Sequence, residues 1–182
     1  VALKDSENYA WTDGSNGSLS FSFVINKQVV VEPTIGSTTY NGNPQTANIA
    51  GTSLYTVKAN AGGTNAGNYN VVLSLVDSNN YKWSSTENSD VTLTFTINKA
   101  QVAKPVADDR TFIYTGSEQT YNIASSDLYT ISGNSQTYAG NHIVTVTLKD
   151  TTNYEWVDEN SDSLSYTFAI NKAQNSWTNA PT

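Results

Sequence analysis

Apolar residues occupy every second position in several short stretches of the chain, with small or polar residues between them. This period of two is typical of strands that bury one face. It predicts strands over residues 19–25, 71–75, 93–97, 144–148 and 164–170, with shorter strands near 112–114, 120–123 and 129–131. Clusters of Ser, Asn and Gly separate these runs, and no stretch shows a helical period. The pattern therefore predicts an all-β fold.

The same motifs recur along the chain at a fixed spacing. Asn-Tyr-x-Trp occurs at residues 8–11, 80–83 and 153–156, which places its tryptophans about 72 residues apart. Leu-x-Asp precedes each copy at 3–5, 75–77 and 148–150, and Ile-Asn-Lys follows at 25–27, 97–99 and 170–172. Tyr-x-Gly-x-x-Gln occurs at 40–45 and 114–119, and Ala-Gly-Asn at 66–68 and 139–141. Motifs that recur in one order at one period indicate tandem repeats.

The repeat divides the chain into four predicted segments. Residues 1–29 are the C-terminal part of a truncated repeat, 30–101 and 102–174 are complete repeats, and 175–182 begin a further one. Because the sequence starts at Val1 rather than at a methionine, we expect more protein before it.

Each complete repeat is predicted to be a small β-sandwich, most simply an immunoglobulin-like one. A β-grasp-like or other compact β module is the alternative. A unit of about 72 residues buries a modest fraction of its surface. Large aromatic side chains compensate, since one buried Trp or Tyr removes roughly 150–250 Å² from water. Trp83 and Trp156 are therefore predicted to anchor the two cores.

The predicted repeats follow one another without a flexible linker. Lys27 and Pro33 are close in sequence, as are Lys99 and Pro105, and no Gly/Ser-rich stretch lies between them. Proline lacks an N–H group and ends strand pairing. Short joints favour an extended rod over loosely strung beads.

Composition narrows the classes of function. Charged residues make up only 14% of the chain, so Ser, Thr, Asn and Gln must cover most of the surface. The formal net charge of −7, with few and scattered Lys and Arg, argues against a nucleic-acid partner. No apolar run is long enough to span a bilayer, so we expect no membrane insertion. The lack of cysteine excludes thiol catalysis and thiolate metal sites, and it is compatible with export.

No motif of a catalytic, cofactor or metal site stands out, and we predict that the protein is not an enzyme. The lone histidine, His142, takes the place of Tyr69 in the other complete repeat and is expected at the surface or at a strand edge. Asp108/Asp109 and Asp158/Glu159 are expected to be solvated loop residues, since adjacent strand residues point to opposite faces. A weak calcium site at Asp158, Glu159 and Asp162 lacks the spacing of a dedicated loop.

Two further residue sets allow both an ordinary and a special interpretation. Asp5, Asp77 and Asp150 follow strands and are expected to cap turns through backbone N–H groups. An intramolecular Lys–Asn amide bond is the special alternative. Its candidates are Lys27, Lys99 and Lys172, with Asn26, Asn98 and Asn171. Exposed lysine is the commoner case, and adjacent residues on one strand cannot form the bonded pair.

Exposed aromatic side chains can form a platform for sugar rings. The candidates for such a platform are Tyr55, Tyr69, Tyr129, Tyr138 and Trp177. Tyrosine in small β domains is more often half-buried with its hydroxyl group at the rim, and we expect that arrangement here.

Taken together, these motifs resemble the tandem immunoglobulin-like (MBG-type) repeats of bacterial cell-surface and adhesin-like proteins. The resemblance rests on four motifs: Tyr-x-Gly-x-x-Gln, Ala-Gly-Asn-(Tyr/His), Leu-x-Asp-x-x-Asn-Tyr-x-Trp and Phe-x-Ile-Asn-Lys-Ala. Residues 173–178 resemble the opening of a neighbouring repeat variety. The resemblance covers essentially the whole chain. It implies an exported, extracellular, surface-attached stalk, and it names no receptor.

The leading hypothesis is accordingly a non-catalytic spacer whose partners are neighbouring repeats of the same chain. One alternative is a module that binds a glycan or a host surface protein. An aromatic patch present in one repeat and absent from the other would favour it. The other alternative is a fibre subunit, in which another molecule completes the sheet of residues 1–27 by strand addition.

Overall fold

The structure, a computed structural model, describes residues 1–108, 111–158 and 160–175. The described residues form strands and turns and include no helix, so the fold is all-β and sandwich-like. None of the described segments is a helix with the length and apolar character needed to cross a membrane.

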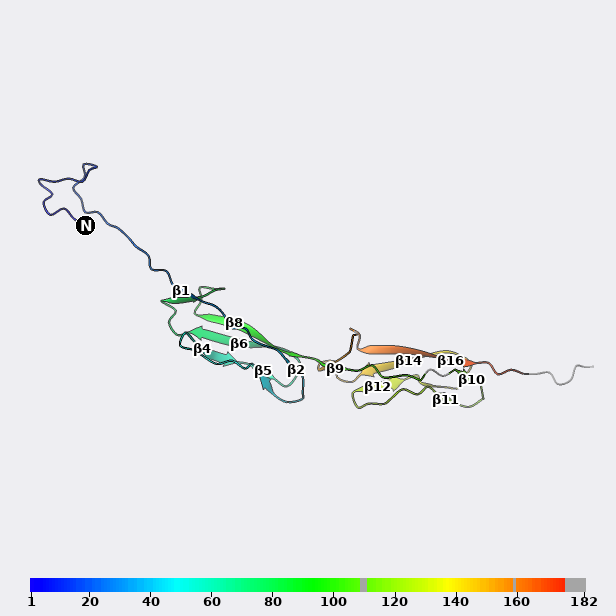
Figure 1. The fold of residues 1–182 in the computed structure, drawn as a ribbon. Helices are drawn as coiled ribbons and strands as arrows, with labels where there is room; N and C mark the ends of the chain where they lie inside the picture. The colour runs from blue at the N-terminus through cyan, green and yellow to red at the C-terminus, as the bar shows by residue number, and fades with distance from the viewer. Residues whose placement is uncertain (109–110, 159, 176–182) are drawn as a thin grey trace, which may run out of the picture.

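The strands form two groups that repeat one pairing scheme (Figure 1). We call β1–β8 the first half and β9–β16 the second half. In the first half, a sheet with the order β2-β8-β6-β4 is accompanied by the pairs β1-β7 and β3-β5. Its strands are β1 Gln28–Val30, β2 Thr38–Thr39, β3 Gln45–Thr46, β4 Tyr55–Asn60, β5 Gly62–Gly63, β6 Gly67–Leu75, β7 Tyr81–Trp83 and β8 Asp90–Asn98.

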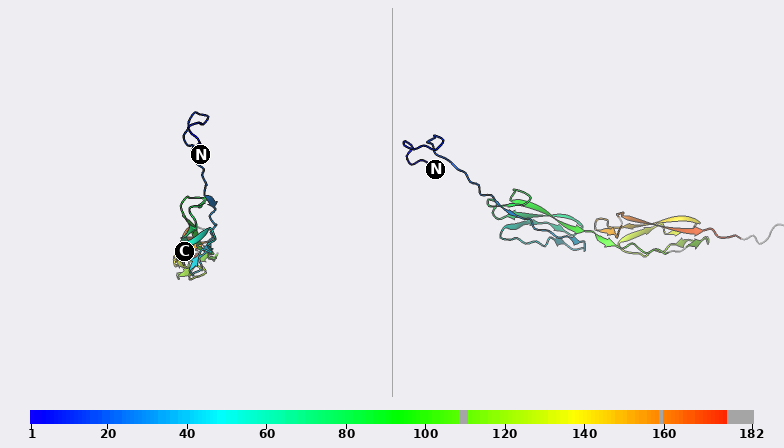
Figure 2. Two further views of the ribbon diagram at one scale, coloured as in Figure 1. Left: turned by 90° about the vertical axis from the view of Figure 1, so that its left-hand side faces the viewer. Right: turned by 45° about the horizontal axis from the view of Figure 1, so that its top comes forward.

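The second half has the sheet β10-β16-β14-β12 and the pairs β15-β9 and β11-β13. Its strands are β9 Ala100–Val102, β10 Phe112–Ile113, β11 Gln119–Thr120, β12 Tyr129–Ser132, β13 Ser135–Gln136, β14 Gly140–Leu148, β15 Tyr154–Trp156 and β16 Ser163–Asn171. Figure 2 shows the two groups of strands following one another along the chain. The predicted repeat boundaries, 29/30 and 101/102, fall inside β1 and β9. These two strands pair with β7 and β15, respectively.

Both sheets are mixed. The long pairs β6-β8 and β14-β16 are antiparallel, whereas β2-β8 and β10-β16 run parallel, as do β1-β7 and β9-β15. A parallel neighbour requires a long connection between the two strands. In each half that connection carries the other strands of the unit.

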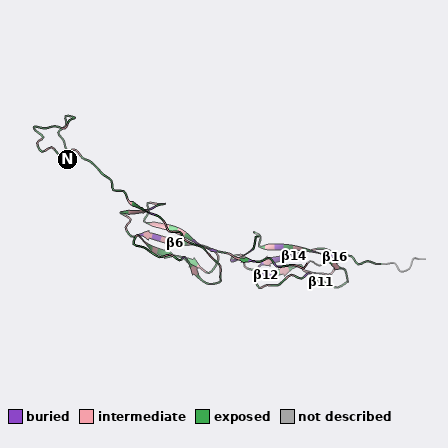
Figure 3. Ribbon diagram, in the orientation of Figure 1, coloured by how far each residue is buried: buried purple, intermediate pink, exposed green. Residues whose placement is uncertain are grey.

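The predicted alternation is confirmed in the central strands. In β6, Val71, Leu73 and Leu75 are buried, and β14 repeats this with Val144, Val146 and Leu148 (Figure 3). The apolar positions of β8 and β16 face the same cores. Each hydrophobic cluster draws its residues from one half alone.

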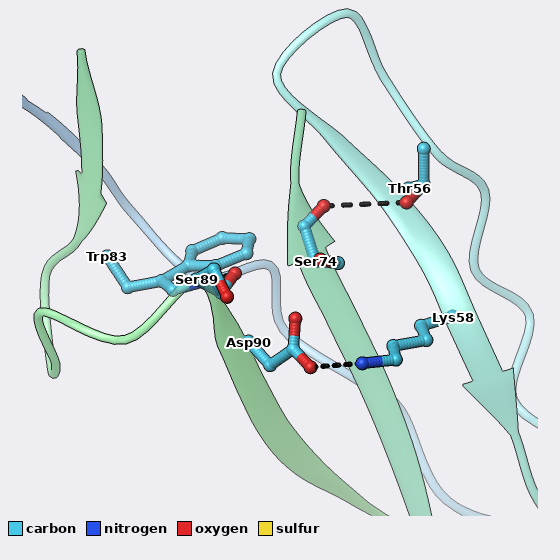
Figure 4. A network of polar contacts seen from close by, with 6 residues as sticks. All are labelled: Thr56, Lys58, Ser74, Trp83, Ser89 and Asp90. Atoms are coloured by element: carbon cyan, nitrogen blue, oxygen red, sulfur yellow. Dashed lines mark hydrogen bonds and ion pairs between the residues drawn. The ribbon is translucent and has the colours of Figure 1, made fainter. Parts of the chain in front are cut away.

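Trp83 and Trp156 anchor these cores as predicted, each with 1% of its surface exposed. Trp83 packs against the ring of Tyr55. Its indole N–H donates to the carbonyl of Ser89 at 3.1 Å, and Figure 4 shows these two residues. Nearby, Lys58 and Asp90 form an ion pair of 2.5 Å across the outer face of the sheet (Figure 4). The burial of both the ring and its polar N–H group explains why one aromatic residue stabilises so small a unit.

The predicted strand over residues 19–25 is wrong. No strand forms before Gln28, and Phe21, Phe23 and Ile25 are exposed, Phe23 to 85%. The matching residues in the first half, Phe95 and Ile97, are buried because β8 lies between β2 and β6. The described part of the chain supplies no such partners to residues 19–25, and a strand without a neighbour has no ladder of hydrogen bonds.

Candidate functional site

The two halves touch at a turn that recurs in the sequence. In this turn Asp150 Oδ1 accepts the backbone N–H groups of Thr152 and Asn153, both at 3.1 Å. Asp150 Oδ2 accepts the side-chain amide of Asn153 at 2.8 Å. Asp77 holds Asn79 and Asn80 in the same way, and Asp5 does so with Glu7 and Asn8. The predicted role of these aspartates as turn caps is confirmed.

Asn153 differs from its equivalent Asn80 in what covers it. Asn80 is exposed, whereas Asn153 is the one polar residue described as buried, at 6% exposure. Its Oδ1 accepts the backbone N–H of Ala66 at 2.8 Å, and its amide donates to Asn65 Oδ1 at 3.2 Å. Asn65 and Ala66 belong to the first half, so these bonds cross from one half to the other.

An aromatic pair lies at the same contact. Tyr40 of the first half and Tyr154 of the second have ring centroids 5.3 Å apart at an interplanar angle of 80°. This is the edge-to-face geometry that aromatic rings prefer, and such a pair contributes about 0.5–1.5 kcal/mol beyond the area it buries. We call the set Tyr40, Asn65, Ala66, Asn153 and Tyr154 the joint.

The joint brings together three of the recurring motifs. Tyr40 opens Tyr-x-Gly-x-x-Gln, Ala66 opens Ala-Gly-Asn, and Asn153 and Tyr154 open Asn-Tyr-x-Trp. The sequence analysis identified these motifs as signs of a tandem repeat but did not predict that they contact each other. Their recurrence at fixed spacing was the available signal, because a contact between successive repeats must repeat with the same period.

The electrostatics of the turn favour a charged aspartate. The hydrogen bond from the Asn153 side chain lowers the pKa of Asp150, and the backbone N–H groups and the charge of Lys99 act in the same direction. Asp77 has a lowered pKa for the same main reason, the bond from Asn80, and Lys27 contributes there. A capped, ionised carboxylate of this kind holds a turn in place and is poorly suited to proton transfer.

A second polar cluster ties β1 to the loop after β7. The carboxylate of Glu32 accepts the Ser84 hydroxyl, and its Oε1 accepts the N–H and hydroxyl of Ser85 at 2.9 and 2.6 Å. The hydroxyl bonds, that of Ser84 first, lower the pKa of Glu32 to about 2. These hydrogen bonds connect two segments of the first half that are 52 and 53 residues apart in sequence.

His142, expected at the surface or at a strand edge, is half-buried near the start of β14. Its Nε2 lies 2.8 Å from the Tyr138 carbonyl, and its ring packs 5.2 Å from Phe168. Tyr69 does the same in the first half, donating its hydroxyl to the Asn65 carbonyl at 2.7 Å. The histidine therefore occupies a packing position that both halves use.

The carboxylates that the structure describes do not gather into a metal site. Among the described residues, no three Asp, Glu, His or Cys side chains are placed to hold a metal ion. Asp109 and Glu159 lie outside the described residues. Asp158 and Asp162 share the loop between β15 and β16, while Asp108 lies in the segment between β9 and β10. A shallow, open depression beside β15 is lined by Gln101, Glu155, Trp156, Val157, Asp158 and Asn160.

The aromatic candidates do not form one platform. Tyr55 and Tyr129 pack against Trp83 and Trp156 at 5.5 and 5.4 Å, and Tyr69 is half-buried. Tyr138 alone among the described candidates is exposed, at 75%. Trp177 lies outside the described residues.

Two of the three lysines of the recurring Ile-Asn-Lys motif act on turn aspartates through their charge. Lys99 acts electrostatically on Asp150, and Lys27 acts on Asp77. A Lys–Asn amide bond at these positions stays a prediction.

Comparison with known proteins adds no family assignment. Neither a scan against protein-family models nor a search of curated proteins returns a match to this sequence.

Proposed function

We propose that this chain is a segment of a non-catalytic stalk in a bacterial surface or adhesin-like protein, built from small immunoglobulin-like repeats that follow one another as an extended rod. The joint carries the proposal. It uses residues of three recurring motifs to hold one half against the next, through two hydrogen bonds and a ring pair.

A spacer needs a defined angle between successive units. Three contacts at the joint, two hydrogen bonds and one ring pair, support such an angle. The hydrogen bonds hold the Asn153 side chain at Ala66, while the ring pair holds Tyr154 at Tyr40. Because β9 starts two residues after β8 ends, little free chain remains to bend. These features favour a stiff connection over a flexible one.

The surface chemistry supports the same function. The chain carries few charges and many hydroxyl and amide side chains, which suits a solvated spacer better than a site built for a charged ligand. The recurring aromatic residues Tyr55, Trp83, Tyr129 and Trp156 are used in the cores.

Nitroxide distance measurements test the stiffness of the joint. Because the chain lacks cysteine, Thr94→Cys and Thr167→Cys introduce the only two thiols, at matching exposed positions of β8 and β16. We expect a single narrow distribution of distances between the two labels. A broad distribution would show that the halves move independently and would contradict the rod.

Surface location needs a separate test. Antibodies raised against the chain should bind intact cells of the producing bacterium, and protease treatment of those cells should remove the signal. Binding only after lysis would contradict an extracellular stalk.

A fibre subunit is the second candidate, supported by the exposed side chains of Phe21, Phe23 and Ile25. The equivalents of Phe23 and Ile25 are buried in both halves, where neighbouring strands are present, so a donated strand can cover these side chains. Sedimentation of the full chain over a range of concentrations tests this candidate. Concentration-dependent assembly that Phe23→Asp abolishes would favour the fibre, and a monomer at every concentration would exclude it.

A further inference from the structure

The far end of the second half repeats the surface that the first half contributes to the joint. Tyr114 stands in the place of Tyr40, and its N–H donates to Asn171 at 2.8 Å just as that of Tyr40 donates to Asn98. Gly140 and Gly67 pair with Ile170 and Ile97 and have nearly the same φ, 151° and 154°. The backbone at this end therefore has the shape that receives Asn153 and Tyr154 at the joint.

This second surface is uncovered in the described part of the chain. Tyr138 is 75% exposed and Tyr114 is 38% exposed, whereas Tyr40 is half-buried against Tyr154. The N–H of Ala139 occupies the place of the Ala66 N–H and has no acceptor among the described residues. A directed donor beside two exposed rings forms a surface with defined binding geometry.

We propose that Tyr114, Tyr138 and Ala139 form a docking surface for the Asp-x-x-Asn-Tyr turn of a further repeat of this type. The proposal rests on the proposed stalk function and names the partner at this end. The Ala139 N–H donates to the side-chain oxygen of the incoming asparagine, and the Tyr114 ring takes the incoming tyrosine edge to face.

The course of the chain supports this occupant. Residues 171–174, Asn-Lys-Ala-Gln, repeat residues 98–101, where the chain leaves β8 and enters β9. A repeat that continues from Lys172 in the same way reaches the docking surface with its turn, as the second half reaches the first.

One difference makes this surface distinct from the joint. Tyr138 replaces Asn65, so the incoming asparagine loses the amide acceptor that Asn153 uses and meets a phenol ring instead. The second contact is therefore expected to be weaker in hydrogen bonding and richer in aromatic packing.

Amide hydrogen exchange on an extended chain tests the proposal. In the extended chain, a copy of residues 100–171 replaces residues 173–182, so that it follows Lys172 directly. We expect exchange at the Ala139 N–H to slow by about tenfold or more in the extended chain, as expected for a gained hydrogen bond. The Ala66 N–H should be protected in both chains and is the internal reference.

Two variants of the extended chain sharpen the result. Alanine at the asparagine of the added copy that matches Asn153 should abolish protection at Ala139 and leave Ala66 unchanged. Tyr138→Asn restores the contacts of the joint and should increase protection at Ala139.

The outcomes separate this proposal from the stalk itself. Protection at Ala66 without protection at Ala139, in both the extended chain and its Tyr138→Asn variant, overturns the docking surface and leaves the existing joint intact. Loss of protection at both amides contradicts the stalk as well. Binding of the unextended chain to a glycan array that Tyr138→Ala abolishes, with Ala139 unprotected in the extended chain, would assign this end to carbohydrate instead.

Discussion

Asn153→Ala and Asn80→Ala form a matched pair that measures the joint. Both replacements remove the same local bond, from the asparagine amide to the turn aspartate, at 2.8 Å in one half and 2.7 Å in the other. Only Asn153→Ala also removes the contacts to Asn65 and Ala66. The difference between the two variants therefore isolates the contact between the halves.

The expected difference follows from the two bonds that cross the joint. An intramolecular hydrogen bond contributes about 0.5–1.5 kcal/mol net, so two contribute about 1–3 kcal/mol. The Ala66 N–H loses its acceptor in Asn153→Ala, which places the effect in the upper part of that range if water cannot reach it. We expect Asn153→Ala to lower the free energy of unfolding by about 2 kcal/mol more than Asn80→Ala.

Urea unfolding of the full-length variants gives this difference. Amide resonances from β6 and β14 report on the two halves separately, which a global signal does not. With a typical slope of about 1–3 kcal/mol per molar urea, the midpoint of the second half should fall in Asn153→Ala by about 1 M more than the midpoint of the first half falls in Asn80→Ala. Equal losses in the two variants, within about 0.5 kcal/mol, would refute the reasoning, because the joint would then add no stability.

Three further predictions concern the halves themselves. Trp83→Ala should lower the free energy of unfolding of the first half in urea by about 3–5 kcal/mol, because the ring is fully buried. Trp11→Ala, in the segment before β1, is the control and should leave that transition unchanged. Gly133→Ala should lower the melting temperature more than Gly116→Ala. Both glycines have positive φ, which costs a residue with a side chain about 1–2 kcal/mol of strain. Only at Gly133 would the new Cβ also lie 2.5 Å from a backbone oxygen, that of Ile143. The pKa of Glu32 is lowered from its ordinary value of 4.5 to about 2 in the folded state. The ionised carboxylate therefore contributes its full stabilisation above the ordinary pKa and loses it as the pH falls below the lowered pKa. We expect the free energy of unfolding to fall between about pH 4.5 and about pH 2. Glu32→Gln should flatten this part of a curve of melting temperature against pH, and an unchanged curve would show that the Ser84 and Ser85 bonds contribute little to stability.

The joint gives motif residues that already act inside one half a second role in the contact between halves. A side chain such as Asn80 is exposed in its own half, yet the equivalent Asn153 is buried once another half covers it. A motif residue that looks dispensable in an isolated repeat can therefore be necessary in a series of them.

Local sequence patterns were enough to predict the central strands, the capped turns and the core tryptophans. The period of two identified the central strands β6, β8, β14 and β16, because each has one face on a core and one in solvent. The recurring Asp-x-x-Asn spacing predicted the capped turns, since those bonds span only two or three residues. Trp83 and Trp156 were predicted as core anchors from their size and from their place in the two complete repeats.

Only the tertiary structure decided which strands pair and which motifs meet. The parallel pairs β2-β8 and β10-β16 join residues far apart in sequence, and nothing in the local pattern distinguishes a parallel from an antiparallel neighbour. For the same reason residues 19–25, with the pattern of β8, form no strand: alternation makes a segment able to pair, but the neighbouring strands must be present. The joint is the clearest case, because Asn65 and Asn153 are 88 residues apart and their contact depends on how one folded half lies against the next.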